Sequence, residues 1–232
     1  IDIDKLIEGT NEILTANRNS LQLFDMLHSM RQFDDLTYVH SVNVALIASI
    51  LGQWLKFSEK DIRILTISGL LHDIGKIMIP NEILTKPGKL TVAEYNIMKQ
   101  HVNFGYEKVK NQNIDIRIKE ACLLHHEKCD GTGYPFGLKS DHIPAVAKII
   151  AIADVYDAMT SARVYRGALC PFEVIDTMYK DAFTKFEPEY ILPFLKNVAS
   201  SYINNDVRLS DGRIGKVVLI NENALSLPIV QC

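Results

Sequence analysis

Cysteine is scarce in this chain, which argues against a fold held together by disulfides. The four cysteines, Cys122, Cys129, Cys170 and Cys232, are spread unevenly over 232 residues. A small secreted domain would carry a denser framework, so a reducing cytoplasm is the expected location. The chain also lacks the roughly 18 uninterrupted apolar residues of a membrane span and a basic-then-apolar signal pattern, so no membrane contact is expected.

An excess of positive charge is missing as well. The chain carries 25 Lys and Arg against 28 Asp and Glu, a formal net charge of -3. A broad basic surface that holds long nucleic acid by counterion release is therefore not expected, whereas a small phosphorylated ligand in a local pocket is compatible with this charge. Because the first residue is Ile1 rather than Met, we expect a fragment of a longer polypeptide that has room for an upstream sensory or receiver domain.

Helical periodicity dominates the middle of the chain, and the 47% hydrophobic content is enough for one large core. The helices predicted from spacing cover about residues 37–51, 59–76, 116–129, 144–158 and 171–203. Thr91 and Glu94 form a capping-box pattern before a further helix, which carries His101. From about Asp206 the pattern changes to β-branched runs with glycine turns, which predicts two or three short strands.

The expected fold class is therefore mostly α, with a short C-terminal β extension. The expected parts are an N-terminal helical connector at 1–33, a helical catalytic domain at 34–203 and a small β extension at 204–232.

Histidine and aspartate recur at positions that should face the core. Five of the seven histidines lie on predicted helices, either on an apolar face or in an adjacent pair, and two aspartates have similar surroundings. A single such histidine is more often structural than a ligand, but a buried carboxylate without a partner is heavily penalised, and a divalent cation offsets that cost. Metal ligation accounts together for His40, His72, Asp73, His101, His125, His126 and Asp154.

The number and type of these residues favour a pair of transition metals. Mixed imidazole and carboxylate ligands suit iron, manganese or zinc better than magnesium or calcium. Two ions about 3.5–4 Å apart, bridged by a carboxylate and a hydroxide, would use the whole set, and Asp73 is the candidate bridge. Lys76 follows three residues later and would lie on the same side, where it could stabilise charge on a phosphoryl oxygen. Taken alone, Lys76 is better explained as a solvated lysine at a helix C-terminus, where the helix dipole favours it.

A zinc site that uses thiolates is an alternative, because Cys122, His125, His126 and Cys129 fall within one short stretch. A small apolar cysteine packed on a helix is the commoner outcome, so this alternative is discounted.

Two long motifs resemble the signatures of the HD-GYP family, a branch of the HD phosphohydrolases. The first motif is His72-Asp73-Ile74-Gly75-Lys76, followed by Ile79-Pro80, Ile83-Leu84 and Lys86-Pro87-Gly88-Lys89-Leu90. The second motif contains His125-His126-Glu127, Asp130-Gly131-Thr132-Gly133-Tyr134-Pro135, Ile152-Ala153-Asp154 and Thr160-Ser161-Ala162-Arg163-Val164-Tyr165-Arg166. The resemblance covers about residues 34–196.

This resemblance implies a bacterial, cytoplasmic phosphodiesterase that hydrolyses cyclic di-GMP to pGpG, GMP or both with a metal-bridging hydroxide. It implies two divalent ions, with iron or manganese favoured over zinc, nickel and magnesium. By analogy, one ion is held by His40, His72, Asp73 and Asp154, and the other by Asp73, His101, His125 and His126. Asp73 and Lys76 are the implied catalytic residues, and the implied substrate contacts are Tyr134, Pro135, Arg163 and Arg166. A packed tyrosine in an ordinary glycine-rich turn and a solvated basic edge are the alternatives for those contacts.

Other functions and several departures stay open at this level. A hydrolase that prefers cyclic GMP-AMP would use the same chemistry, and a catalytically weak receptor could bind the nucleotide or dock a GGDEF-domain partner without turnover. A homodimer is also open. Leu36 stands where some members carry a glutamate that helps to bind a third metal, so two metals are predicted. Lys148 replaces a frequent arginine, and Glu187 replaces an aspartate.

Overall fold

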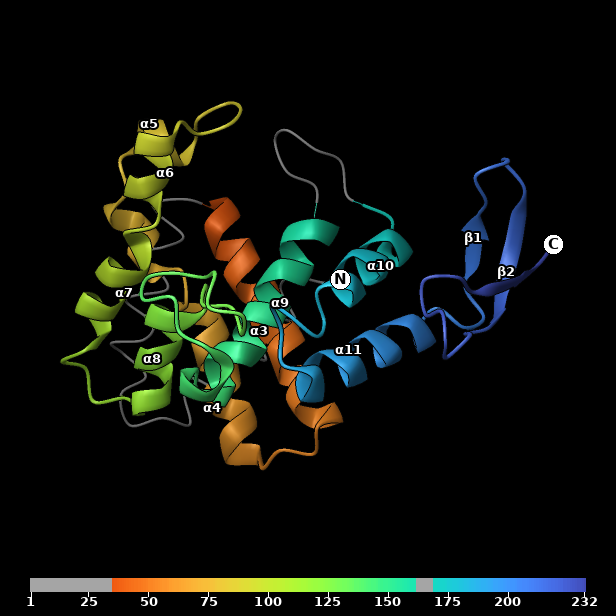
Figure 1. Ribbon diagram of the computed structural model, residues 1–232, viewed down its shortest axis with the longest axis horizontal. Helices are drawn as coiled ribbons and strands as arrows, with labels where there is room; N and C mark the ends of the chain where they lie inside the picture. The colour runs from red at the N-terminus through yellow and green to blue at the C-terminus, as the bar shows by residue number, and fades with distance from the viewer. Residues whose placement is uncertain (1–34, 162–168) are drawn as a thin grey trace.

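A computed structural model describes residues 35–161 and 169–232, and its described part is mostly helical (Figure 1). The α-helices are α3 (Asp35–Trp54), α4 (Glu59–Leu71), α5 (Asn81–Leu84), α6 (Val92–Met98), α7 (His101–Val109), α8 (Ile116–Leu124), α9 (Ala145–Thr160), α10 (Pro171–Lys180) and α11 (Pro188–Ser200). The 3-10 helices are η1 (Ile74–Met78) and η2 (Ser140–His142), and the strands are β1 (Asp206–Arg208), β2 (Ile214–Leu219) and β3 (Ile229–Gln231). The mostly α fold class with a short β extension is confirmed, whereas the predicted connector at 1–33 lies outside the described residues.

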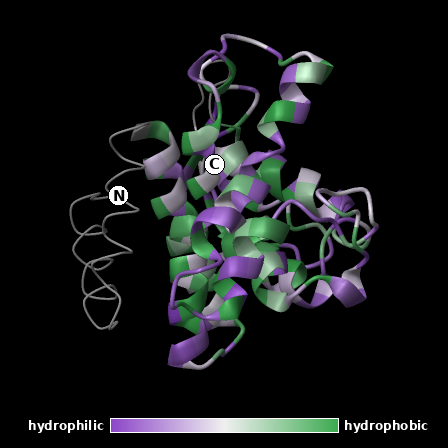
Figure 2. Ribbon diagram, turned by 90° about the vertical axis from the view of Figure 1, so that its left-hand side faces the viewer, coloured by the Kyte–Doolittle hydropathy of each residue, from purple (hydrophilic) through white to green (hydrophobic). Residues whose placement is uncertain are grey.

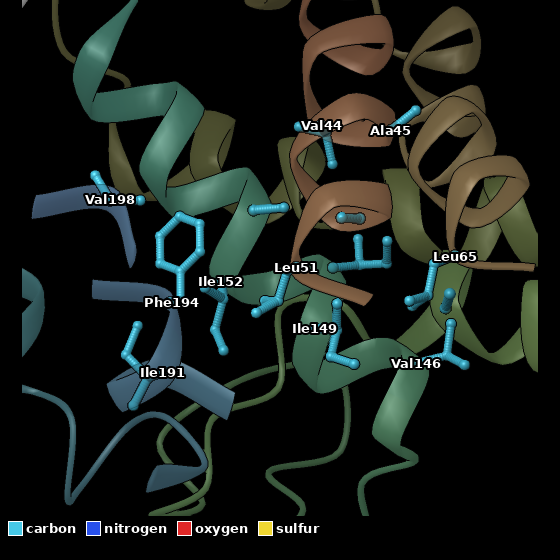
Figure 3. Close-up of a cluster of buried hydrophobic side chains, with 14 of the residues drawn as sticks. Val44, Ala45, Leu51, Leu65, Val146, Ile149, Ile152, Ile191, Phe194 and Val198 are labelled. Atoms are coloured by element: carbon cyan, nitrogen blue, oxygen red, sulfur yellow. The ribbon is translucent and has the colours of Figure 1, made fainter. Parts of the chain in front are cut away.

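The core lies where α3, α4, α9 and α11 meet. Figure 3 shows Leu51, Leu65, Ile149 and Phe194 from these four helices in one apolar cluster, and all four side chains are buried. Figure 2 shows the same organisation by colour, with hydrophobic residues gathered in the central helices and hydrophilic ones toward the loops. Burial of one large apolar side chain contributes roughly 1.5–3 kcal/mol, so this cluster fixes the relative positions of the helices that carry the site.

Helix α3 departs from the expectation that no segment could span a membrane. By length and composition, Leu36–Trp54 is long and apolar enough to do so. Packing in the core explains part of this apolar composition, because Val44, Ala48 and Leu51 of α3 are completely buried. A helix at the centre of a core has the same composition.

Three helices end earlier than the sequence predicted. The helix capped by Thr91 and Glu94, α6, stops at Met98, so His101 begins a separate helix, α7, and does not lie on the capped one. Helix α4 stops at Leu71, and the chain continues through Asp73 into the 3-10 helix η1, whereas a helix to Lys76 was expected. Helix α8 stops at Leu124 rather than near Cys129. A residue after the last turn of a helix is not held to one helical face, so its side chain can point along the helix axis. The early ends therefore change the directions in which the side chains after Leu71 and Leu124 can point.

The 3-10 helix η1, which follows the end of α4, crosses α7 closely. Gly75 packs so tightly on α7 that a side chain in its place would overlap the carbonyl oxygen of His101 and the amide of Gly105. Across the same crossing, a methyl group at Gly105 would meet its nearest atom at 3.4 Å, an ordinary contact. The need for glycine is therefore confined to one side of the crossing.

This asymmetry predicts opposite effects for two matched substitutions. Gly75→Ala should lower the free energy of unfolding by about 1–3 kcal/mol through overpacking, whereas Gly105→Ala should leave it unchanged or raise it by up to about 1 kcal/mol through helix propensity. Denaturant titration of the two variants measures both values. Equal destabilisation by the two substitutions would contradict the asymmetric crossing.

The strands form one antiparallel sheet in the order β1-β2-β3. Val207 pairs with Gly215, and Val217 pairs with Val230. Val217 is completely buried and joins the main core, so the sheet packs on the helical body through this inner face. Figure 1 shows the sheet beyond the end of α11, away from α7 and α8.

Candidate metal centre

The residues predicted as metal ligands come from separate parts of the chain and meet in one cluster. Most of them lie at the ends of helices, and two lie within long core helices. His40 lies in α3, His72 caps the end of α4, Asp73 precedes η1, His101 begins α7, His125 caps the end of α8, His126 follows it, and Asp154 lies in α9. The early ends of α4 and α8 therefore place His72, Asp73, His125 and His126 at the same place.

Asp73 stands at the centre of this cluster and faces two groups of imidazoles. Its Oδ1 lies 3.3 Å from His101 Nε2 and 3.8 Å from His125 Nε2. Its Oδ2 lies 3.3 Å from His72 Nε2 and 3.6 Å from His40 Nε2. Two sets of potential ligand atoms, each within 4.8 Å of one another, share this residue: Asp73, His101, His125 and His126, and His40, His72 and Asp73. One carboxylate with one oxygen toward each set has the geometry of a bridge.

Asp154 lies between the two sets. Its Oδ1 is 3.0 Å from His40 Nε2, and its Oδ2 is 3.8 Å from His126 Nδ1. Its assignment to the ion on the His40 side stays a prediction, because its other oxygen faces the opposite set.

Hydrogen bonds outside the cluster fix how the imidazoles present themselves. In three of the histidines, Nδ1 lies against the backbone carbonyl oxygen of a residue three or four positions earlier and must donate to it. The pairs are His72 to Gly69 at 2.7 Å, His101 to Met98 at 2.7 Å and His125 to Ala121 at 3.0 Å. A neutral ring that donates through Nδ1 keeps a lone pair on Nε2, so these three rings turn the lone pair of Nε2 toward Asp73.

The protonation states favoured by the surroundings are those that metal ligands require. Burial lowers the pKa of His126 to about 3, and burial with neighbouring imidazoles holds the pKa of His125 well below its usual range. Burial alone would raise the pKa of Asp73, but the Lys76 ammonium beside it holds that pKa well below its usual range. Neutral imidazoles beside an ionised carboxylate are ready to bind a cation without first losing protons.

His40 is the exception, and its difference follows from its acidic neighbours. Burial lowers its pKa, but hydrogen bonds with Asp154 and Asp157 outweigh that effect and raise the pKa to about 9. A divalent cation bound at this position would replace the proton that these carboxylates otherwise hold on the ring.

The nitrogen and oxygen atoms that face the centre of the cluster could bind a cation, but they are not satisfied by hydrogen bonds with one another. Among the described residues, His72 Nε2 and Asp73 Oδ1 are buried and have no hydrogen-bond partner. Such an unsatisfied atom costs about 1–3 kcal/mol. His101 Nε2 and His125 Nε2 also face each other at 3.4 Å with lone pairs on both atoms. Lone pairs that converge on one point from several elements are satisfied by a positive ion between them.

Lys76 reaches the cluster from η1. Its Nζ lies 2.5 Å from Asp73 Oδ2, and its side chain is 22% exposed. The prediction expected a continuous α-helix to place Lys76 beside Asp73, but the 3-10 turn does so instead. This ammonium points at the candidate bridge, whereas a solvated lysine would point away from it.

The glycine-rich loop brings one predicted substrate contact against the cluster. The Tyr134 ring stacks on the His126 ring with 4.7 Å between centroids, and the Tyr134 amide donates to the His126 carbonyl at 3.2 Å. Pro135 follows through a cis peptide bond. The other two predicted contacts, Arg163 and Arg166, lie outside the described residues and stay predictions.

Glu127 holds the same loop in place, a role that sequence reasoning missed. Its buried carboxylate accepts from the amides of Phe136 at 2.7 Å and Leu138 at 2.9 Å. The signal available was an acidic residue directly after the adjacent histidines, but its partners are backbone amides, which no motif reveals.

Asp157 is the second residue that sequence reasoning missed. Its carboxylate accepts from His40 Nδ1 at 2.6 Å, Asn43 Nδ2 at 3.0 Å and Ser161 Oγ at 2.9 Å. A carboxylate that receives the outer N–H of a metal-binding histidine fixes the orientation of the ring. Its position three residues after Asp154 on a helix was the available signal.

This contact predicts a loss of metal affinity when the carboxylate is removed. Asp157→Ala should weaken metal binding by about 10–100-fold, because His40 then loses the group that orients it. Competition with a chromophoric chelator measures the dissociation constant, and Asp141→Ala, at a side chain that is 74% exposed, is the matched control. An unchanged constant for Asp157→Ala would show that His40 needs no such support.

The discounted zinc–thiolate site finds no support in the described part of the chain. Cys122 is buried and lies 3.3 Å from the Leu71 carbonyl, and burial raises the pKa of its thiol to about 12. Neither Cys122 nor Cys129 belongs to the two sets of potential ligands found among the described residues. A thiol with this pKa is a poor source of the thiolate that zinc requires.

Two departures from the family pattern, Lys148 and Glu187, contact each other. Lys148 Nζ lies 2.6 Å from Glu187 Oε2 and 2.8 Å from Ser140 Oγ. The pair ties α9 to the residue that caps α11. Lysine is shorter than arginine and glutamate is longer than aspartate, so the two replacements together keep the reach across this gap.

Comparison with known proteins gives a family match over most of the chain. The matching family is described as an HD domain, and the match covers residues 8–190. A cyclic di-GMP phosphodiesterase of Pseudomonas aeruginosa is 36% identical over 203 residues, which cover 87% of this chain and 49% of that protein. The 3′3′-cGAMP-specific phosphodiesterase 2 of Vibrio cholerae is 32% identical over 194 residues, which cover 82% of this chain and 37% of that protein. The chain thus spans half or less of the length of these relatives.

A solved structure shares the fold. The HD domain of the L. monocytogenes phosphodiesterase PgpH, determined in complex with cyclic-di-AMP, matches with a TM-score of 0.58 at 18% sequence identity. The match covers 76% of this chain and 95% of that one.

Proposed function

Because this chain belongs to the HD domain family, in its HD-GYP branch, we propose that it is a metal-dependent phosphodiesterase that hydrolyses cyclic di-GMP. The observation that carries this proposal is the position of Asp73 between two sets of imidazoles, with one oxygen toward each. A site with this shape fits two-metal hydrolysis of phosphate esters.

The side chains of this protein supply the framework of the proposed reaction. When bound, a pair of divalent cations supplies a water of lowered pKa and neutralises charge at the phosphoryl group. Asp73 would hold the two cations at a fixed separation. The imidazoles would bind the cations through Nε2, and those of this kind are His72, His101 and His125. Lys76 Nζ, beside Asp73 Oδ2, would donate to a phosphoryl oxygen as negative charge grows on it. Iron or manganese is the proposed metal, since the donor set combines imidazole with carboxylate ligands.

Tyr134 and Pro135 are the proposed substrate contacts on the side of the glycine-rich loop. The stacking of Tyr134 on His126 holds the phenol ring directly beside the centre, where it would exclude water from one side of the bound diester. A GGDEF-domain partner and a homodimer stay predictions of the family resemblance.

Hydrolysis by the purified chain, loaded with iron or manganese without oxygen, tests the proposal. Chromatography of the products should detect pGpG, GMP or both from cyclic di-GMP, and a chelator should abolish their formation. The proposed activity would be refuted if the chain fully loaded with iron and the chain fully loaded with manganese both failed to hydrolyse cyclic di-GMP.

A preference for cyclic GMP-AMP is the second candidate, favoured by the similarity to a relative named for that substrate. The ratio of kcat/KM for the two cyclic dinucleotides separates the candidates. A higher value for cyclic GMP-AMP would replace cyclic di-GMP as the proposed substrate and leave the proposed metal chemistry intact.

A further inference from the structure

Three side chains beside the metal centre form a surface that the proposed mechanism does not fully use. Lys99 Nζ lies 5.3 Å from the centre of the Tyr95 ring and 6.0 Å from the centre of the Tyr134 ring. We call Tyr95, Lys99 and Tyr134 the aromatic shelf. Because Tyr134 stacks on His126, the shelf is continuous with the cluster of potential metal ligands.

The local structure explains why the shelf and the cluster adjoin. Tyr95 lies in α6, and Lys99, four residues later, caps the end of that helix, so the two side chains share one face. His101 begins α7 only two residues further on. The turn that presents an imidazole to Asp73 therefore also presents an ammonium group between two phenol rings.

The exposure of the shelf leaves room for a ligand. Tyr95 is 48% exposed, although it is a large aromatic residue, and Lys99 and Tyr134 are partly exposed. An exposed lysine over an aromatic ring is common and by itself needs no function. The contact between Tyr134 and His126 distinguishes the aromatic shelf from such a common pair. A flat ligand on the shelf would contact Tyr134, and Tyr134 in turn contacts His126, a candidate metal ligand.

We propose that the aromatic shelf binds a guanine base of the cyclic dinucleotide and makes Lys99 a specificity residue. The inference deepens the proposed function and rests on it. The π-face of the base would stack against the exposed ring of Tyr95 and the accessible part of the Tyr134 ring, as bases do on aromatic platforms. Lys99 would donate to O6 and N7, the two acceptors that guanine displays on one edge.

Adenine meets the same ammonium less well. Its corresponding edge carries the N7 acceptor beside an N6 amino group, which donates hydrogen bonds and cannot accept one from lysine. Stacking would be retained, because every base has a π-face. The shelf therefore predicts selection by Lys99 and general affinity from the two tyrosines.

Lys99→Met tests the selection, because it keeps the length of the side chain and removes its charge. KM for cyclic di-GMP should rise about tenfold, the scale of one lost base contact, with metal content and turnover of bis(4-nitrophenyl) phosphate unchanged. Inhibition of that base-free reaction by GMP should weaken by a similar factor, whereas inhibition by AMP should change little. Lys108→Met, at an exposed lysine of α7, is the matched control and should alter none of these values.

The two substrates keep the inference separate from the function it rests on. If the wild-type chain hydrolyses cyclic di-GMP but Lys99→Met leaves its KM and the inhibition by GMP unchanged, the shelf does not read guanine. If the wild-type chain cleaves only the base-free diester, the proposed substrate is wrong, and a Lys99-dependent difference between GMP and AMP would still support the shelf. Equal inhibition by GMP and AMP in both proteins would overturn it.

Discussion

Asp73→Ala is expected to lower hydrolysis of cyclic di-GMP by at least about 10⁴-fold, the scale seen when one member of a tightly interdependent catalytic unit is removed. Both oxygens of this carboxylate face imidazoles of a separate set, so its loss removes a ligand from two positions at once. Metal content, measured by plasma emission spectrometry on the same samples, should fall from two ions per chain to one or none.

Two further variants make this result interpretable. Asp73→Asn keeps the shape of the side chain, so loss of metal and activity in this variant cannot be assigned to a cavity or to misfolding. Asp141→Ala removes an aspartate that is 74% exposed and should leave both values unchanged. Full turnover with two bound ions in Asp73→Asn would refute the bridging role of Asp73.

Lys76→Met should lower kcat by about 10²–10³-fold while KM changes little, because the ammonium is proposed to act on charge that develops during the reaction. Lys76 lies against Asp73 and stabilises the ionised carboxylate. Bound cations would take over that second role, so the variant should keep its metal content. Steady-state kinetics on metal-loaded protein measure the separation of kcat from KM.

Lys76→Arg and Lys89→Met complete this experiment. Arginine keeps the positive charge and should restore part of kcat, while Lys89, on the exposed turn before α6, should contribute nothing. An unchanged kcat in Lys76→Met would mean that the lysine serves only as the partner of Asp73.

The sequence predicts that the candidate ligands lie close together, because their spacing places them on the buried faces of helices. His40 and Leu51 lie on the same inward stripe of α3, and Asp154 lies on the buried side of α9. Such positions predict burial, and buried imidazoles and carboxylates require a common partner. Their roles as ligands stay predictions, since the structure supplies their proximity and leaves the metal to be measured.

What the sequence could not predict depends on contacts between distant segments. The periodicity of α4 continues to Lys76, but the helix ends at Leu71, and the turn that follows it brings Gly75 against the first turn of α7. Asp157 accepts a hydrogen bond from His40, which lies 117 positions earlier in the sequence. A sequence motif of neighbouring residues cannot predict a contact over such a separation. Helix boundaries and supporting carboxylates are both set by tertiary packing, which a one-dimensional pattern does not contain.

Anomalous diffraction from crystals of the iron- or manganese-loaded chain tests the central claim most directly. Two metal peaks should appear about 3.5–4 Å apart, one on each side of Asp73, with His72 and His101 on opposite ions. A single peak, or a pair of peaks that Asp73 does not join, would contradict the account.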